Sequence, residues 1–362
     1  MYHLSEPTIA EGTGAALQRV MASNYFSPGP EVEAFEEEWA AYCGVKYGVA
    51  CNSGTTAIEM AMVALHPKGR VLIPAFTCIP TAVPFVHAGY EIQLVDCGPD
   101  GNVTVQTLKD AYRGEVLFVP VHIYGNPVKQ DVIMAAESLG LTVMEDCAEA
   151  HGAGVKERLV GSYGEIGCFS FRGDKMITSG GVGGMGVTDS KELADYMRRY
   201  SLLFLTGPSE TRYDADGIGN GIQMGELQAA FGRCQIPTLE RLISVRRQLA
   251  KVYDTELREF DSYLEPAPRA PGSVVWRYMI TIYNAHSRPV FISRLIEKGV
   301  QAMASFRSLS TVLPPLTGKH YTSCPVAESL GNHGVCLPIH ANLTEADIKK
   351  ICSIIGGVLR EL

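Results

Sequence analysis

Three short polar segments of the 362-residue chain combine residue types that bind anions or transfer protons, and each directly follows an apolar run. The first, Asn52-Ser53-Gly54-Thr55-Thr56, consists of small residues between a strand-like run and a helix-like one. Backbone N–H groups at the start of a helix bind phosphate, and small residues let a ligand approach them. The same residues also suit an ordinary turn in which Ser53 or Thr55 caps the helix. The segment alone leaves both interpretations open.

The second segment, residues 145–151, places three carboxylates and one histidine within seven positions: Glu145, Asp146, Glu149 and His151. In an open α/β sheet, ligands bind beyond the carboxyl ends of the strands. Polar groups at this place are therefore candidates for binding or acid–base chemistry. The plainer interpretation is a strand end exposed to solvent.

The third segment runs from Ser170 to Lys175 and is followed by a glycine-rich stretch, residues 179–184. A lysine that follows a buried strand and is flanked by glycines can be a desolvated amine, which suits covalent chemistry on a carbonyl group. An ordinary exposed lysine in a turn is the alternative.

Seven short apolar runs are predicted to be the strands that position these segments. Polar or amphipathic stretches separate them, which is typical of an α/β domain with a mostly parallel sheet. The expected strands cover residues 47–51, 70–74, 91–96, 116–121, 141–145, 166–171 and 184–187. A helix is predicted over residues 55–65, so its N-terminus follows the carboxyl end of the first strand.

A second amphipathic helix is predicted over residues 30–42, before the sheet. Its apolar residues Val32, Phe35 and Trp39 have the spacing of one helix face, so we expect them to point inward. The acidic run Glu36-Glu37-Glu38 is expected to lie on the solvated face.

The C-terminal third of the chain has a different pattern. Residues 225–253 are predicted to be helical, with a break near Pro237. A strand over 274–283, a helix over 289–298 and a last helix from Thr344 then indicate a smaller α+β unit, with a surface loop over 313–325. We therefore expect a large domain over residues 1–237, with an N-terminal arm, and a small domain over 238–362.

Composition excludes several classes of protein. The formal charge is −8, and no Lys/Arg block exceeds a pair, so nucleic acid is not an expected partner. Neither a leader-like start nor an apolar run of about 20 residues is present, so no membrane segment is expected. The 10 cysteines are scattered singly, without a Cys-x-x-Cys pair, which predicts reduced thiols, no metal site and a cytoplasmic location.

In their order along the chain, these motifs resemble the DegT/StrS family of sugar-nucleotide aminotransferases. The resemblance extends over nearly the whole sequence. Besides the three segments above, it includes Leu4-Ser5-Glu6-Pro7, Gly29-Pro30-Glu31-Val32-Glu33, Ile73-Pro74-Ala75-Phe76-Thr77, Val121-His122-Ile123-Tyr124-Gly125, Gly183-Gly184-Met185, residues 224–230 and Pro325-Val326-Ala327-Glu328.

The resemblance implies fold type I, a large domain with a mixed, mostly parallel seven-stranded sheet, and pyridoxal 5′-phosphate (PLP) as cofactor. Lys175 would bind PLP covalently and, once released, move protons as general acid–base. Asp146 would pair with the protonated ring nitrogen, and Glu149 would contact the phenolic oxygen. Three residues would hold the phosphate: Gly54, Thr55 and Ser170.

Two places depart from the family pattern. Cys78 stands where an aromatic residue usually stacks on the PLP ring, so either Cys78 or Phe76 is expected to pack there. The family also donates an asparagine across a homodimer, and here Asn220 lies one place early while Gln223 replaces an arginine. We expect a homodimer in which Asn220, or else Gln223, reaches the neighbouring phosphate.

The resemblance implies transfer of an amino group from an amino acid, typically L-glutamate, to a keto group of a nucleotide-linked deoxysugar. The nucleotide, the sugar and the aminated carbon stay open, as does a cyclitol ketone as acceptor. One alternative is the PLP-dependent sugar dehydratase branch, which carries histidine where Lys175 stands. The other is a non-catalytic regulatory protein that kept the fold.

Overall fold

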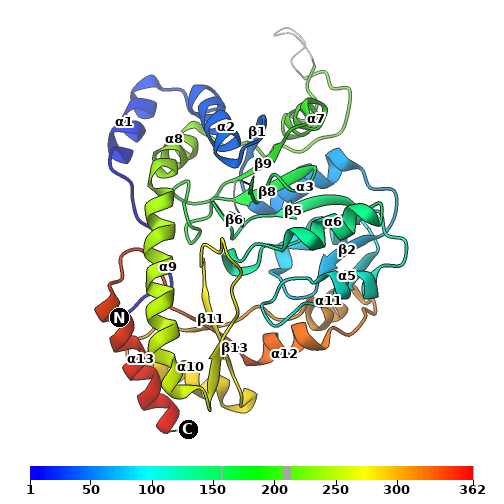
Figure 1. The fold of residues 1–362 in the computed structure, drawn as a ribbon. Helices are drawn as coiled ribbons and strands as arrows, with labels where there is room; N and C mark the ends of the chain where they lie inside the picture. The colour runs from blue at the N-terminus through cyan, green and yellow to red at the C-terminus, as the bar shows by residue number, and fades with distance from the viewer. Residues whose placement is uncertain (156–157, 207–212, 362) are drawn as a thin grey trace.

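The computed structural model describes residues 1–155, 158–206 and 213–361. Its main sheet has seven strands in the order β1-β9-β8-β5-β4-β2-β3, and only β9 runs antiparallel to its neighbours (Figure 1). The strands are β1 (Tyr47–Cys51), β2 (Val71–Pro74), β3 (Ile92–Val95), β4 (Leu117–Phe118), β5 (Thr142–Asp146), β8 (Ile166–Ser170) and β9 (Gly184–Thr188). This confirms the α/β fold and all seven predicted strands.

One strand is much shorter than the sequence pattern predicts. Residues 116–121 were expected to form a strand, but the ladder includes only Leu117–Phe118. Pro120 has no N–H group to donate to a neighbouring strand. Val121 rejoins the sheet through an isolated bridge to Asp146, so the strand's end still reaches the carboxyl edge.

Helices and short turns precede, connect and follow the strands of the large sheet (Figure 1). They are α1 (Thr13–Ser23), α2 (Pro30–Cys43), α3 (Gly54–Leu65), η1 (Ile79–Thr81), α4 (Val83–His87), α5 (Val105–Ala111), η2 (Ile123–Gly125), α6 (Gln130–Ser138), the small hairpin β6 (Gly154–Val155) and β7 (Arg158–Leu159), α7 (Lys191–Ser201) and α8 (Glu226–Gln235). Among the described helices, none is both long and apolar enough to cross a bilayer.

Helix α2 packs its predicted apolar face, Val32, Phe35 and Trp39, into the core. Its acidic run differs from the prediction at Glu36, which is buried. The Glu36 carboxylate accepts a hydrogen bond from the Ala50 N–H at 2.7 Å and pairs with Arg198 at 2.7 Å. A buried carboxylate needs such partners, and both come from other elements of the chain.

The C-terminal part begins where η3 (Ile236–Thr238) interrupts the helical run at Pro237, as predicted. A second, antiparallel sheet has the order β10-β11-β13-β12. Its elements are α9 (Leu239–Glu256), η4 (Leu257–Phe260), β10 (Leu264–Pro266), β11 (Tyr278–Ile282), η5 (Ala285–Ser287), α10 (Arg288–Glu297), β12 (Met303–Ala304), α11 (Leu309–Thr317), α12 (Pro325–His333), β13 (Gly334–Leu337) and α13 (Glu345–Arg360). A separate apolar core lies under this sheet, while residues such as Leu242, Leu309 and Ala327 pack into the core of the large sheet. The division into residues 1–237 and 238–362 stays a prediction.

The predicted loop over residues 313–325 is partly wrong, because α11 continues to Thr317 and contains two prolines. The Ser308 side chain caps the helix by accepting from the Ser310 N–H at 3.3 Å. Leu309 and Leu313, one turn apart, are both buried. Burial of this apolar face outweighs the local preference of proline to end a helix.

Candidate active site

A pocket lies at the carboxyl ends of β5 and β8, beside the N-terminus of α3. Six of the seven predicted site residues line it: Gly54, Thr55, Asp146, Glu149, Ser170 and Lys175. They come from three segments that are far apart in the sequence. The pocket therefore has the position that ligands take in open α/β sheets.

The first segment forms both a helix cap and a wall of the pocket. Ser53 caps α3, because its hydroxyl accepts from the Thr56 N–H at 3.2 Å while Thr56 reaches back to the Ser53 N–H at 3.1 Å. The amides of Gly54 and Thr55 are the first in the helix and cannot bond within it. A Cβ atom on Gly54 would lie 2.6 Å from Cβ of Ser170, so only glycine lets the two walls meet so closely.

Asp146 ends strand β5 with its carboxylate buried in the pocket wall. One oxygen accepts from the Ala148 N–H at 3.0 Å, and the other accepts from the Thr81 hydroxyl at 2.8 Å. The Thr81 hydroxyl also contacts that of Thr77 at 2.8 Å. Burial raises the pKa of Asp146, and the two hydrogen bonds and Lys175 oppose that shift. The carboxylate is thus held in one orientation, available to a cationic partner.

Glu149 lies between Lys175 and the backbone of residue 124. Its Oε2 accepts from the Tyr124 N–H at 2.8 Å, and its Oε1 lies 3.7 Å from Nζ of Lys175. Burial raises the pKa of Glu149 to about 7, although Lys175 opposes the shift. Near neutral pH this group can therefore either donate or accept a hydrogen bond.

The other two polar groups of residues 145–151, Glu145 and His151, do not line the pocket. His151 is buried and contacts the rings of Trp39, Phe169 and Phe171. Glu145 is fully buried and belongs to a separate hydrogen-bonded cluster. The plainer interpretation of a solvent-exposed strand end is therefore wrong, because all four side chains are buried.

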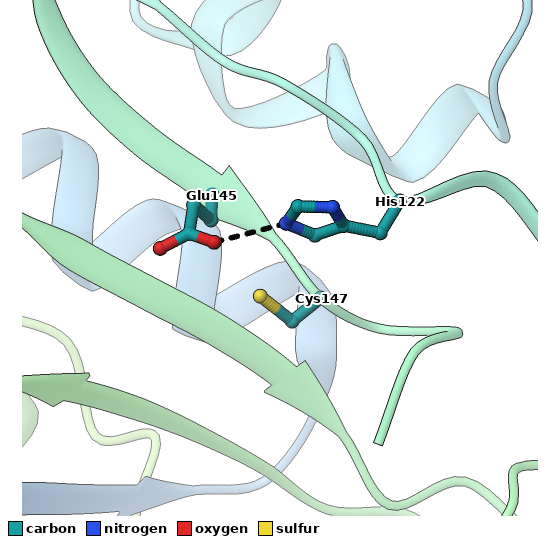
Figure 2. Close-up of side chains that lie close together, drawn as sticks. All are labelled: His122, Glu145 and Cys147. Atoms are coloured by element: carbon teal, nitrogen blue, oxygen red, sulfur yellow. Dashed lines mark hydrogen bonds and ion pairs between the residues drawn. The ribbon is translucent and has the colours of Figure 1, made fainter. Parts of the chain in front are cut away.

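Figure 2 shows that Glu145 cluster, in which His122, Glu145 and Cys147 face one another. The Val128 N–H donates to Nδ1 of His122 at 3.0 Å, so the other ring nitrogen, 2.9 Å from Glu145, carries the proton of the neutral ring. Burial raises the pKa of Cys147 well above its usual range. Glu145 also accepts from three backbone amides, those of Gly161, Tyr163 and Gly164. Both Glu145 oxygens and Nδ1 of His122 therefore already accept hydrogen bonds from donors within the chain.

Lys175 is 9% exposed, so the alternative of an ordinary surface lysine is wrong. Its Nζ lies 4.0 Å from the centre of the Trp276 ring. The loop that carries it is closed by backbone hydrogen bonds, including Phe171 N–H to the Gly183 carbonyl at 2.8 Å. This amine faces a carboxylate and an aromatic ring in a pocket that limits access of water.

Several residues that line the pocket were not predicted. Thr81 orients Asp146, and both Trp276 and Arg277 come from the C-terminal part of the chain. Arg277 carried a usable signal, because it is a cation inside a strand-like apolar run. Its contact with this site depends on tertiary structure alone.

Of the two residues expected to pack on a cofactor ring, Cys78 lines the pocket. Burial raises the pKa of Cys78 to about 11, so it carries a neutral thiol. Phe76 is fully buried beneath the pocket wall, with its ring 6.0 Å from that of Tyr124. Of these two residues, Cys78 is the one placed to touch a ligand bound in the pocket.

The structure does not bring Asn220 to the pocket of its own chain. Asn220 is exposed, and its amide donates to Oε1 of Glu59 at 3.1 Å. Gln223 lies in a shallow surface depression beside Leu202 and Leu205. Both residues therefore lie on an outer face of the chain.

Comparison with known proteins covers nearly the full length of the chain. The model of the DegT/DnrJ/EryC1/StrS aminotransferase family matches residues 7–356. GDP-perosamine synthase of Caulobacter vibrioides is 33% identical, over 92% of this chain and 91% of the relative. UDP-N-acetyl-3-dehydro-alpha-D-glucosamine 3-aminotransferase of Acidithiobacillus ferrooxidans is 32% identical, over 94% and 92%.

Solved structures also match this chain over nearly its whole length. DesV of S. venezuelae is 28% identical and superposes with a TM-score of 0.87 over 95% of this chain and 93% of that one. The aminotransferase PseC of Helicobacter pylori, 21% identical, has the same fold, with a TM-score of 0.92 and complete coverage of both chains. The chain belongs to the DegT/DnrJ/EryC1/StrS aminotransferase family.

Proposed function

We propose that this protein binds PLP in the pocket beside α3 and uses it to aminate a keto group of a nucleotide-linked sugar. The observation that carries the proposal is the convergence of Lys175, Asp146 and Glu149 on the N-terminus of α3. A reactive amine, a buried carboxylate and free helix amides are the groups that the aldehyde, ring nitrogen and phosphate of PLP require. The residues present therefore fit the cofactor.

Each residue has a proposed role. Gly54, Thr55 and Ser170 hold the phosphate through backbone N–H groups and hydroxyls. Asp146, held by Thr81 and the Ala148 N–H, keeps the ring nitrogen protonated by charge pairing. Bound PLP acts as an electron sink for the carbon that loses a proton. Lys175 would anchor the cofactor through its amine and, once free, would carry that proton as general acid–base.

Glu149 is proposed to hold the phenolic oxygen of the cofactor. Its Oε2 is fixed by the Tyr124 N–H at 2.8 Å, so its other oxygen faces the pocket and Lys175. A carboxyl group that shares a proton near neutral pH can bond this oxygen in either charge state. Cys78 is proposed to pack against the cofactor ring.

The substrates are proposed from the relatives. Two curated relatives above 30% identity are named as a GDP-perosamine synthase and a UDP-sugar 3-aminotransferase, so both are named for products or substrates that carry a nucleotide and a sugar. L-glutamate is the proposed amino donor. The ten free thiols fit a reducing compartment, and we propose the cytoplasm.

A dehydratase also shares this fold. GDP-4-keto-6-deoxy-D-mannose-3-dehydratase of E. coli, solved with bound hydrated PLP, superposes with a TM-score of 0.91 at 23% identity, so fold alone does not separate the two activities. The buried amine of Lys175 favours transamination, because a lysine at this place can hold the cofactor covalently.

We also propose a homodimer whose shared face includes the segment around Asn220. Four apolar side chains near it are exposed: Leu202, Leu203, Leu205 and Ile218, the last at 95%. Such a patch beside polar residues is typical of a protein interface. Asn220 or Gln223 would then complete the neighbouring phosphate site.

The test of function is a two-stage absorbance experiment. The PLP-loaded protein is first mixed with amino acids, and loss of the absorbance of lysine-bound cofactor identifies the donor. A panel of GDP-, UDP- and dTDP-linked keto sugars is then added to the aminated enzyme. Return of the absorbance with one of these sugars supports the proposal, and its absence with every nucleotide-linked keto sugar of the panel would overturn it.

A further inference from the structure

The wall of the pocket next to Lys175 contains one carboxylate shared by two guanidinium groups. Asp174 accepts from Arg172 with both oxygens, at 2.7 Å each, and Oδ2 also lies 3.1 Å from Arg277. All three residues line the pocket. Because one negative charge faces two positive charges, this wall can accept a second anion.

Arg277 is the more buried of the two arginines, and besides its contact with Asp174 it donates to the Leu4 carbonyl at 3.4 Å. Its side chain is 4% exposed, whereas that of Arg172 is 62% exposed. Within the described residues, its Nε is buried without a hydrogen-bond partner. A buried guanidinium with a free N–H group is suited to bind a planar carboxylate through two parallel hydrogen bonds.

Trp276 places Arg277 beside the reacting amine. The guanidinium carbon of Arg277 lies 4.2 Å from the centre of the Trp276 ring, and Nζ of Lys175 lies 4.0 Å from the same centre. The Trp276 N–H donates to the Asp174 carbonyl at 2.7 Å, which holds the ring in place. One ring therefore sets the separation between the amine and the guanidinium.

We propose that Arg277 binds the α-carboxylate of the amino donor and that Asp174 occupies Arg277 whenever the donor is absent. This inference rests on the proposed transamination. In an α-amino acid the carboxylate is attached to the carbon that bears the reacting amine, so its receptor must lie next to Lys175. A nucleotide diphosphate is separated from the reacting carbon by the sugar ring and belongs farther out.

The proposed exchange between the Asp174 carboxylate and the donor carboxylate allows one pocket to bind two substrates that differ in charge. The sugar ring brings no carboxylate to this wall, and a buried arginine left without a counter-ion is strongly unfavourable. Asp174 supplies that counter-ion while the sugar is bound. When the donor enters, Asp174 keeps its two-oxygen contact with Arg172 and gives up only the single contact with Arg277.

The first test uses glutarate, which has the carboxylates of glutamate but no amine and cannot react. Its dissociation constant is measured by calorimetry on the PLP-loaded protein, with glutaramide as the uncharged control probe. Arg277→Gln and Arg277→Lys are expected to weaken glutarate binding roughly tenfold or more, because neither reproduces the planar fork. Asp174→Asn is expected to tighten it severalfold, because the competing carboxylate is gone.

The matched control is Asp195→Asn on the exposed face of α7, which changes the net charge equally and should leave glutarate binding unchanged. If Asp174→Asn does not tighten binding, or if Arg277→Lys binds glutarate like the unaltered protein, the inference is wrong. Loss of UDP and GDP binding in the Arg277 variants, with glutarate binding intact, would assign the arginine to the diphosphate instead.

The second test separates this inference from the proposed function. In the donor half-reaction, Arg277→Lys is expected to raise the glutamate concentration that gives half-maximal bleaching. The keto-sugar concentration that gives half-maximal return of the absorbance is expected to change much less. If the unaltered protein shows no bleaching with any amino acid, the proposed function fails, while the glutarate measurements still decide whether Arg277 binds carboxylates.

Discussion

The Nζ atom of Lys175 lies 4.0 Å from the centre of the Trp276 ring, which joins the two parts of the chain at the pocket. Trp276 also fixes the residue before the lysine, because its N–H donates to the Asp174 carbonyl. A cation facing an indole ring in a desolvated place gains about 2 kcal/mol. The C-terminal part of the chain thereby takes part in holding the Lys175 amine.

Replacing Lys175 by alanine is expected to abolish transamination with the fold intact. The substitution removes both the covalent anchor and the proton carrier, and loss of a general acid–base alone lowers rates about 10²–10⁴-fold. The absorbance of lysine-bound cofactor and the two half-reactions measure the effect, and circular dichroism checks the fold. Lys191→Ala on the surface of α7 is the control. Turnover like that of the unaltered protein in Lys175→Ala would contradict the mechanism.

Asp146→Asn is expected to retain PLP but to slow both half-reactions. An amide cannot hold a proton on the ring nitrogen by charge, but its oxygen can still accept from the Ala148 N–H while its NH2 group donates to the Thr81 hydroxyl oxygen. Stopped-flow absorbance measures the rates, and equilibrium dialysis measures the retained cofactor. Unchanged rates would show that another group contacts the ring nitrogen.

Glu149→Gln is expected to stabilise the cofactor-free protein in a pH-dependent way. Burial raises the pKa of Glu149 to about 7, so between its ordinary value and pH 7 the folded state binds a proton that the unfolded state has lost. The free energy of unfolding of the unaltered protein therefore falls as pH rises through this window, by an amount on the order of 3 kcal/mol.

Glutamine keeps an acceptor for the Tyr124 N–H but does not titrate. The increase in the free energy of unfolding that Glu149→Gln causes should thus be absent near pH 4. It should grow up to pH 7 and stay constant above that pH. Urea unfolding at pH 4, 6 and 8 measures this difference. A difference that does not vary with pH would show that Glu149 is not the group responsible.

Gly54→Ala is expected to destabilise the fold by about 1–3 kcal/mol and to weaken PLP binding. The new methyl group would lie 2.6 Å from Cβ of Ser170, which forces α3 away from β8. Gly14→Ala in α1 is the matched control, because its Cβ would have no atom within 4 Å. Urea unfolding and PLP titration measure both variants, and equal behaviour of the two would disprove the close approach.

A mixture of two inactive variants is expected to regain activity if the dimer shares its sites. A subunit with Asn220→Ala keeps its own Lys175, and a Lys175→Ala partner would supply the missing Asn220. The same pairing with Gln223→Ala shows which side chain reaches across. Sedimentation first verifies the dimer and subunit exchange, and no recovery with either pair would confine the site to one chain.

The sequence by itself determined the local parts of this protein. Strand β1 begins and ends where the apolar run does, and α3 begins next to its Ser53 cap, because apolar runs and capping depend on neighbouring residues. Asp146 and Lys175 could be named as candidates because Asp146 ends one apolar strand and Lys175 follows the end of another by five residues. Their roles were predicted from the family resemblance. Their order along the chain matches the family.

Only the tertiary structure decided what faces these residues. Glu36 was expected in solvent and is buried, because Ala50 and Arg198 from other elements satisfy its carboxylate. Trp276 and Arg277 reach the pocket through the packing of residues far apart in the chain, which no local pattern encodes. Contacts of this kind depend on how the two parts of the chain pack, so the carboxylate receptor beside Lys175 became visible only in three dimensions.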